Sequence, residues 1–416
     1  MKQEKMTKIK SSFLLAAILQ FTIAFGQQAD SLRWMNPANN KFAIEGQAWT
    51  NEVQKPYHRL PARAQKLVRK QVWALSRNST GLVVRFKTDA PQIIVRYTIK
   101  GALNLPHFST TGFSGVDMYS INKDGEWNWL PGSYSFKNTT TKSDTIVYRF
   151  NIPKENIYKT GREYRLYLPI YNTVGWLEIG TAKNYSFTFI AARNERPIVI
   201  YGTSITQGGV ASRAGMAWTS IAGRLLNQPL INLGFSGNGT LDKEMIDLLS
   251  EINAKVYVLD CLGNLMDTVK FPLTEVKRRI IESVKILHEK HPMIPIILAS
   301  FGAFNNERLD KERGNAIHTM NENMKQAYLF LKASGINNIF ILTPEEMEMG
   351  MDDTVDGNHA TDLGMTHYAT SFEKIFRLVL KEPKGTIATT IPREQYREDS
   401  FYNWEERNAE IIKMNQ

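Results

Sequence analysis

The repeat of apolar and polar positions changes near residue 195, which divides the chain into two unlike parts. Before that point, apolar and polar positions alternate over short runs rich in β-branched residues, at 81–86, 92–98, 145–150, 164–168 and 176–179. Turn-forming residues separate these runs, as at Asp89-Ala90-Pro91 and Lys123-Asp124-Gly125. Short alternating strands joined by such turns predict an antiparallel, jelly-roll-like β-sandwich.

Beyond residue 195, short apolar runs alternate with stretches of helical repeat. The expected strands are 198–201, 229–233, 255–259, 294–298 and 338–342. The expected helices are 217–226, 241–249, 274–288, 314–334 and 362–380, and Gly335 is well placed to end the fourth. This alternation predicts a parallel sheet with helices on both faces, a three-layer α/β/α sandwich.

The first 26 residues have the layout of a secretory signal peptide. Lysines at 2, 5, 8 and 10 precede the apolar run 13–25, and the small residues Ala24 and Gly26 stand just before Gln27. The apolar run is too short to span a bilayer, so we expect cleavage and export without stable membrane insertion. The mature protein would then be periplasmic or secreted.

These patterns divide the chain into four segments. The expected segments are a signal peptide at 1–26, a β-sandwich domain at 27–192, an α/β domain at 193–384 and a tail at 385–416. We expect the tail to pack on the body, because Tyr402 and Trp404 would be unfavourable in free solution. The sequence does not indicate an oligomeric state.

Charge and cysteine usage exclude several classes of function. The formal charge is +10, of which the signal region contributes four lysines and one glutamate, leaving about +7 without a long basic block. We therefore do not expect nucleic-acid binding. The single cysteine, Cys261, cannot form an intrachain disulfide, and its place beside an apolar run indicates a packing residue. Zinc, calcium and phosphate-loop spacings are absent from the sequence, so we expect no metal and no cofactor.

Two segments carry candidate chemistry. Ser204 follows the apolar run 197–200, and His359 has a carboxylate, Asp356, three residues before it. Together they offer the nucleophile, base and orienting acid of serine-based acyl transfer. Alone, Ser204 is equally well explained as a helix N-cap and His359 as a surface histidine. Because catalytic groups on parallel sheets gather at the carboxyl ends of strands, we expect Ser204, Asn264 and Ser300 to share one edge.

The combination resembles the SGNH (GDSL-like) hydrolase family, whose four sequence blocks occur in order over residues 197–380. The matching segments are Tyr201-Gly202-Thr203-Ser204, Asn232-Leu233-Gly234-Phe235-Ser236-Gly237, Asp260-Cys261-Leu262-Gly263-Asn264 and Asp356-Gly357-Asn358-His359. Two blocks depart from the family pattern, since Thr203 replaces an aspartate and Leu265 follows Asn264. The resemblance implies that Ser204, Gly237 and Asn264 form the oxyanion hole, with Ser204, His359 and Asp356 as catalytic residues.

The N-terminal region carries a second resemblance. Gly115-Val116-Asp117-Met118-Tyr119 is similar to the Gly-x-Asp-Leu-Tyr signature of a domain that precedes some bacterial SGNH domains. The segments 57–61 and 213–218 and the tail around Trp404 and Arg407 also fit that subgroup. Asp117, Tyr119 and Gln207 are candidate substrate contacts, although Asp117 and Tyr119 could instead fix a loop within the β domain.

The leading hypothesis is an exported esterase that removes small acyl groups, acetyl above all, from a carbohydrate, as the resemblance to bacterial carbohydrate esterases implies. The same residues would serve a lipid or aryl ester hydrolase, or an acyltransferase in which an alcohol replaces water. A different class, a glycan-binding protein with little turnover, is disfavoured because a binder has no need of Ser204, His359, Asp356 and Asn264 together.

Overall fold

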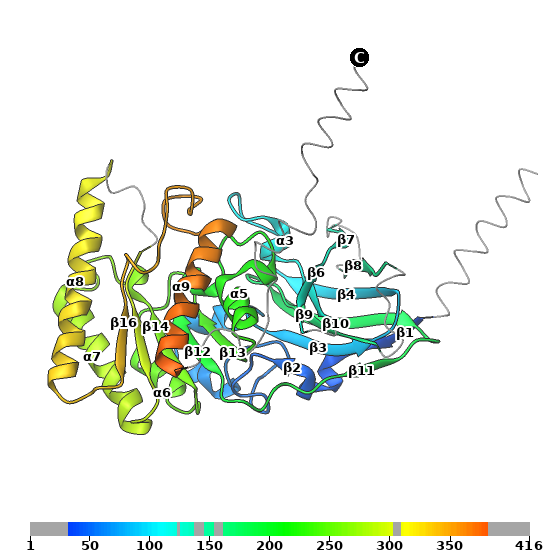
Figure 1. The fold of residues 1–416 in the computed structure, drawn as a ribbon, viewed down its shortest axis with the longest axis horizontal. Helices are drawn as coiled ribbons and strands as arrows, with labels where there is room; N and C mark the ends of the chain where they lie inside the picture. The colour runs from blue at the N-terminus through cyan, green and yellow to red at the C-terminus, as the bar shows by residue number, and fades with distance from the viewer. Residues whose placement is uncertain (1–31, 123–124, 137–144, 154–160, 303–308, 382–416) are drawn as a thin grey trace, which may run out of the picture.

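The computed structural model describes residues 32–122, 125–136, 145–153, 161–302 and 309–381. An antiparallel β part and an α/β part lie side by side along the long axis of the molecule (Figure 1). The expected signal peptide (1–26) and C-terminal tail (385–416) lie outside the described residues. The expected domain boundaries therefore stay predictions.

The β part consists of two sheets in which every strand pairing is antiparallel. The first sheet has the order β1 (Leu32–Met35), β10 (Thr173–Ala182), β4 (Gln92–Lys100), β8 (Thr145–Asn151), β7 (Gly132–Ser135). The second has the order β11 (Phe187–Phe189), β3 (Val83–Thr88), β9 (Arg162–Tyr167), β5 (Asp117–Ile121), β6 (Trp127–Leu130), and β2 (Ile44–Glu45) pairs with β3.

Alternate residues of these strands form one apolar core within the β part, as the period-two pattern predicts. The five runs expected as strands are confirmed as parts of β3, β4, β8, β9 and β10. The core joins buried side chains of both sheets, among them Val84, Phe86 and Leu166 of the second sheet and Val95 and Leu177 of the first.

The α/β part contains a parallel sheet with the order β13 (Leu230–Gly234), β12 (Ile198–Gly202), β14 (Val256–Asp260), β15 (Ile296–Ala299), β16 (Ile339–Leu342). All five strands match the expected runs to within two residues. Residues of β12, β13 and β14 are buried throughout, which explains why these runs are continuously apolar rather than alternating. The fold class expected from the sequence is confirmed.

Helices cover both faces of this sheet. The longer ones are α5 (Trp218–Leu225), α6 (Lys243–Leu249), α7 (Leu273–Lys290), α8 (Lys311–Ala333), α9 (Asp362–Leu380). In Figure 1, α7 and α8 lie together on one face, and α5 and α9 on the other. Gly335, with φ +90°, follows the end of α8 as expected. Within the described residues, no helix is both long and apolar enough to cross a membrane.

The strand order places a switch point beside β12. The chain moves from β12 to β13 on one side and then returns to β14 on the other side of β12. Ligands of open α/β sheets bind outside the carboxyl ends of the strands at such a point. Ser204 follows β12 there, Asn264 follows β14, and Ser300 follows β15, so the three residues share one sheet edge as expected.

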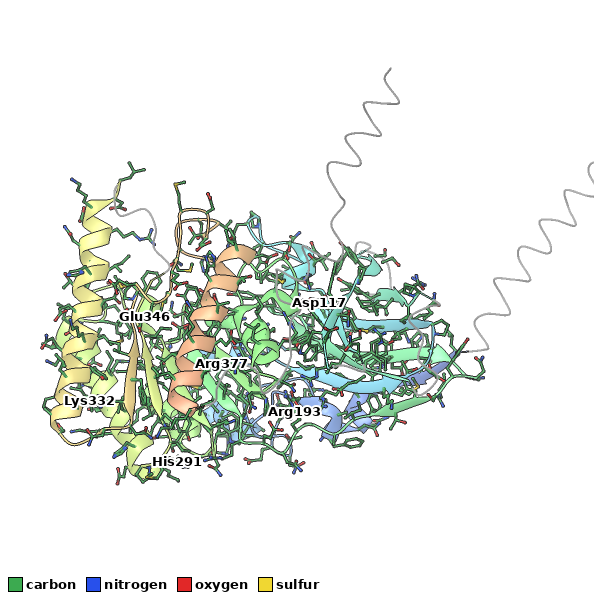
Figure 2. All side chains as sticks on the ribbon, viewed as in Figure 1. Asp117, Arg193, His291, Lys332, Glu346 and Arg377 are labelled. Atoms are coloured by element: carbon green, nitrogen blue, oxygen red, sulfur yellow. The ribbon has the colours of Figure 1, made fainter. Side chains whose placement is uncertain are left out.

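Charged side chains join the two parts where they meet. Figure 2 labels Asp117 and Arg193 in this junction. Arg193 donates to the carboxylate of Glu45 in the β part and to the backbone carbonyl of Asn227 in the α/β part. The apolar core of the α/β part also continues across the junction and includes Trp49 and Leu60. The two parts therefore form one continuous body.

Candidate active site

Ser204 opens the short helix α4 (Ser204–Gln207), directly after β12. Thr203 caps this helix, because its hydroxyl accepts a hydrogen bond from the backbone N–H of Ile205 at 3.3 Å. The cap role considered for Ser204 thus belongs to the residue before it. Only 5% of Ser204 is exposed, and its hydroxyl is directed to His359, with 2.9 Å between Ser204 Oγ and His359 Nε2.

His359 is oriented by the loop that precedes α9. Asp356 Oδ2 lies 2.8 Å from His359 Nδ1. The other carboxylate oxygen accepts the backbone N–H groups of Asn358, at 3.0 Å, and of His359, at 2.8 Å. One oxygen of the carboxylate is therefore held by the backbone of the loop and the other by the imidazole ring. His359 Nε2 then faces Ser204.

The same contacts keep the Asp356 carboxyl ionised. Partial burial raises the pKa of Asp356, but the hydrogen bonds from the backbone N–H and the ring of His359 outweigh it, so the pKa lies below its usual value. At neutral pH the ring of His359 thus faces a carboxylate. This arrangement favours a proton on Nδ1 and leaves Nε2 free to accept one.

Two further loops at the same edge carry candidate oxyanion donors. Gly237, in the loop after β13, is exposed and has φ +66°, a conformation that favours glycine. Asn264, in the 3-10 helix η6 (Leu262–Asn264), accepts the backbone N–H of Gly239 through Oδ1 at 3.0 Å. Because the carbonyl end of its amide is used in this way, the NH₂ end is the group left for another acceptor.

These loops contact the Ser204 segment closely. The backbone N–H of Phe235 donates to the carbonyl of Gly202 at 2.9 Å. A Cβ added to Gly239 would lie 2.1 Å from that same carbonyl oxygen, so the loop after β13 lies directly against the end of β12. The backbone N–H of Gly237, like the NH₂ of Asn264, has no hydrogen-bond partner among the described residues. This edge of the sheet, which also carries Ser204, thus offers two donors without a partner among the described residues.

A buried carboxyl lies against α4. Asp260 ends β14 and accepts the hydroxyl of Thr206 at 2.5 Å. Burial raises the pKa of Asp260 to about 7, although the hydrogen bond from Thr206 opposes that shift. The next residue, Cys261, is buried, and burial holds the pKa of its thiol well above the usual value, in agreement with a packing role.

We expect Asp260 to make the stability of the protein depend on pH. Its pKa is raised on folding, so the folded form binds the proton more tightly, and this stabilisation is lost as pH rises from about 4 to about 7. The loss amounts to at most about 4 kcal/mol. In urea unfolding at pH 4 to 8, the free energy of unfolding of Asp260→Asn should rise relative to that of the wild type as the pH increases. A difference between Asp260→Asn and the wild type that stays constant with pH would contradict the prediction.

Two of the substrate contacts expected from the sequence, Asp117 and Tyr119, have partners within the protein. Only 4% of Asp117 and 6% of Tyr119 are exposed. Asp117 accepts Trp129 Nε1 at 2.8 Å, Arg213 Nη1 at 2.7 Å and the backbone N–H of Gly215 at 3.0 Å. Tyr119 accepts Arg213 as well. Both side chains join the β part to the α/β part, and their contact with a substrate stays a prediction.

Gln207, the third expected substrate contact, also has partners within the protein. The residue is fully buried, and its amide is occupied on both sides. Nε2 lies 3.3 Å from Asn78 Oδ1 and from the carbonyl of Ile170, while Oε1 accepts the backbone N–H of Ser236 at 2.9 Å. Gln207 therefore connects α4 with the loop of Gly237, and a substrate contact of this side chain stays a prediction.

The β part supplies two residues near Ser204 that sequence reasoning missed. The hydroxyl of Tyr171 donates to the backbone carbonyl of Ser204 at 3.4 Å, and burial raises the pKa of Tyr171 to about 12. The exposed ring of His107 lies 6.1 Å from that of His359, centre to centre. Both contacts are long-range, so no local pattern could have indicated them.

His107 also gives the site a set of potential metal ligands. One ligand atom each of His107, Asp356 and His359 lies within 4.8 Å of the others. Imidazole and carboxylate are ligands that zinc accepts. Asp356 and His359 also belong to the chain of contacts with Ser204. A metal bound to these ligands would therefore involve His359, the candidate base.

Comparisons with known proteins give a family for each part of the chain. Residues 195–377 match the GDSL-like lipase/acylhydrolase family, and residues 32–187 match a family described as the N-terminus of Esterase_SGNH_hydro-type. No curated protein matches the chain.

Solved structures are similar over both parts. A structure from Bacteroides ovatus, described as a GDSL-like lipase, is 26% identical, with a TM-score of 0.74 over 84% of this chain and 98% of that one. The salicylyl-acyltransferase SsfX3 of a tetracycline biosynthetic pathway is 18% identical, with a TM-score of 0.64 over the same shares, which shows a common fold. Residues 195–377 thus form a GDSL-like (SGNH) hydrolase domain, residues 32–187 form the Gly-x-Asp-Leu-Tyr-type domain that precedes it, and the chain is an ester-hydrolysing enzyme.

Proposed function

We propose that the protein is an exported serine esterase that removes small acyl groups, acetyl above all, from a carbohydrate. The observation that carries the proposal is the unbroken chain of contacts from Ser204 Oγ to His359 Nε2 at 2.9 Å and from His359 Nδ1 to Asp356 at 2.8 Å. Distances of this size put nucleophile, base and orienting acid within hydrogen-bond reach.

In the first half of the reaction, Ser204 Oγ attacks the ester carbonyl carbon while His359 Nε2 takes the hydroxyl proton. The carbonyl π electrons move to the oxygen, and the oxyanion is stabilised by the N–H groups of Ser204 and Gly237 and the amide of Asn264. The intermediate collapses, the C–O bond to the sugar breaks, and the leaving alcohol receives the proton from His359.

In the second half, water takes the place of the alcohol. His359 removes a proton from this water, which attacks the acyl-serine carbonyl carbon. The bond to Ser204 Oγ breaks, the proton returns to Ser204, and the free acid leaves. Asp356 remains ionised throughout and stabilises the charged ring.

The surroundings of His359 favour a polar alcohol over a long acyl chain. The neighbouring groups from the β part are the exposed imidazole of His107 and the hydroxyl of Tyr171. The nearby ring of Phe108 is 2% exposed and packs edge-on against Tyr171 at 5.1 Å, so it offers little apolar surface. A sugar hydroxyl can bond to polar groups of this kind, whereas a long acyl chain needs an apolar channel.

An acyl-chain series tests the proposal. Purified protein is assayed on p-nitrophenyl acetate, butyrate and octanoate, and acetate release is then measured from acetylated mono- and oligosaccharides. We expect turnover to fall with chain length and acetate to leave the sugars. A preference for octanoate would instead indicate a lipid esterase. Acyl transfer to an added alcohol in preference to water would indicate an acyltransferase. Binding of the sugar without turnover would indicate the glycan-binding alternative.

Asn264 offers a test of the oxyanion role. Replacing it with alanine should lower kcat by about 10²–10³ with a smaller change in KM, because the donor acts on the transition state. Asn264→Asp is the matched variant, since its carboxylate still accepts the N–H of Gly239 but lacks the donor. Both variants should be impaired in steady-state assays. An active Asn264→Asp enzyme would exclude the proposed role.

Export rests on the layout of residues 1–26. N-terminal sequencing of protein recovered from the cell envelope and the medium should give a chain beginning at Gln27. Recovery of the intact N-terminus from the cytoplasm would refute export without affecting the proposed chemistry.

A further inference from the structure

Arg59 is a buried cation without an acidic partner among the described residues. Only 2% of it is exposed, and its guanidinium makes four hydrogen bonds, all to backbone carbonyls. Two of the four remain within the β part: Nε donates to Asn78 at 2.9 Å and Nη2 donates to Leu75 at 2.8 Å. Burial lowers the pKa of Arg59 to about 9, so the group is still charged at neutral pH. A buried charge held only by carbonyls is costly, which calls for an explanation.

The other two bonds cross into the α/β part just before the oxyanion loop. Nη1 donates to the carbonyl of Asn232 at 3.1 Å and to that of Gly234 at 2.8 Å. The guanidinium carbon also lies 4.8 Å from the ring centre of Phe235. Asn232 and Gly234 lie in the second half of β13, and Phe235 follows the strand and leads directly to Ser236 and Gly237. Arg59 therefore fixes the backbone from which the Gly237 loop departs.

A second connection from the same region reaches that loop through Gln207. The hydroxyl of Thr80 donates to the backbone carbonyl of Gln207 at 2.6 Å. The amide of Gln207 in turn accepts the backbone N–H of Ser236 at 2.9 Å. The segment that carries Thr80 also packs tightly against β13, because a Cβ added to Gly81 would lie 2.5 Å from Cβ of Asn232. Thr80 thus holds α4, which carries Ser204, and Arg59 and Thr80 together hold the loop of Gly237.

We propose that Arg59, assisted by Thr80, is a positioning residue for the oxyanion hole, so that the N-terminal β part is a component of the catalytic unit. The proposal rests on the proposed function, because it concerns the donor at Gly237. Arg59 touches neither substrate nor Ser204 and acts through the carbonyls of Asn232 and Gly234. Its planar fork satisfies acceptors on both sides at once, which the single ammonium of lysine cannot do.

The test compares Arg59→Lys with Arg63→Lys in the full chain. Arg63 also crosses the junction, pairing with Glu251, but near the start of β14 and hence at the opposite edge of the sheet. A fluorophosphonate titrates the reactive serine, so that kcat is expressed per functional site, and thermal melting reports stability. For Arg59→Lys we expect kcat to fall roughly 10- to 100-fold with KM changed much less, since small misplacements can cost about 10². Binding of a trifluoromethyl ketone, which mimics the oxyanion, should weaken by the same factor as kcat/KM.

Arg63→Lys should lower the melting temperature at most and leave kcat per site unchanged. A folded Arg59→Lys enzyme with kcat within about twofold of the wild type would overturn the proposal. If Arg59→Lys does not fold, Thr80→Val decides: it keeps the side-chain volume, and it should lower kcat several-fold, while wild-type kcat would refute the positioning role. Failure of the proposed function is distinguishable, because the wild-type enzyme itself would then show no serine-dependent turnover.

Discussion

Replacing Ser204 with alanine should reduce ester hydrolysis by roughly 10⁴–10⁶ while the protein remains folded. The variant lacks the oxygen that forms the acyl-enzyme, and no other hydroxyl is recorded in contact with His359 Nε2 among the described residues. The oxyanion donors remain, so a small residual rate above that in water is expected. Since the lost group is one small polar atom at a site that is 5% exposed, the melting temperature should change little.

Ser300→Ala is the matched control for this variant. Ser300 is also buried and follows β15 at the same edge of the sheet, but it has no histidine partner among the described residues. It should keep turnover close to that of the wild type in the p-nitrophenyl acetate assay. Equal activity of Ser204→Ala and the wild type would exclude Ser204 as the nucleophile.

Replacing His359 with glutamine should have an effect of the same order, about 10³–10⁶, because the serine then loses its base and the leaving alcohol its acid. The loss should appear in kcat measured at saturating ester. It should also remove the burst of product that marks acyl-enzyme formation, since attack by the neutral hydroxyl is slow.

A second histidine–aspartate pair provides the control. His367 Nδ1 lies 2.7 Å from Asp353 Oδ2, much as His359 does from Asp356, but no serine or cysteine side chain bonds to the ring of His367 among the described residues. His367→Gln should therefore retain most of the activity. If both variants lost activity equally, the loss would reflect damage to the loop before α9 rather than removal of a base.

The local patterns of the sequence were sufficient to predict the strands and helices of the α/β part. A continuous apolar run such as 198–201 can only be satisfied by burial on both faces, and β12 is buried throughout. The expected helix 362–380 has the bounds of α9. Strands such as β1, β5, β6 and β7 were not predicted, because short or aromatic-rich segments acquire their structure from the neighbouring strands.

The sequence singles out Ser204, His359 and Asp356, the residues that contact one another in the site. It does not single out the residues through which the β part contacts this edge of the sheet. Gln207 shows the limit: its place beside Ser204 suggested a substrate contact, but the contact partners Asn78 and Ser236 come from distant segments and bury it. Arg59 and His107 likewise lie far from the site in the chain. Only the packing of the β part against the sheet edge gives them a place there.

Covalent labelling of the serine tests the central claim most directly. The protein is treated with a fluorophosphonate, digested, and mapped by mass spectrometry, with Ser204→Ala and Ser300→Ala in parallel. We predict one phosphonylated peptide, modified at Ser204, with labelling that parallels the loss of esterase activity and is absent from Ser204→Ala alone. Complete inactivation with the label on another residue, or full activity after Ser204 is modified, would contradict the account.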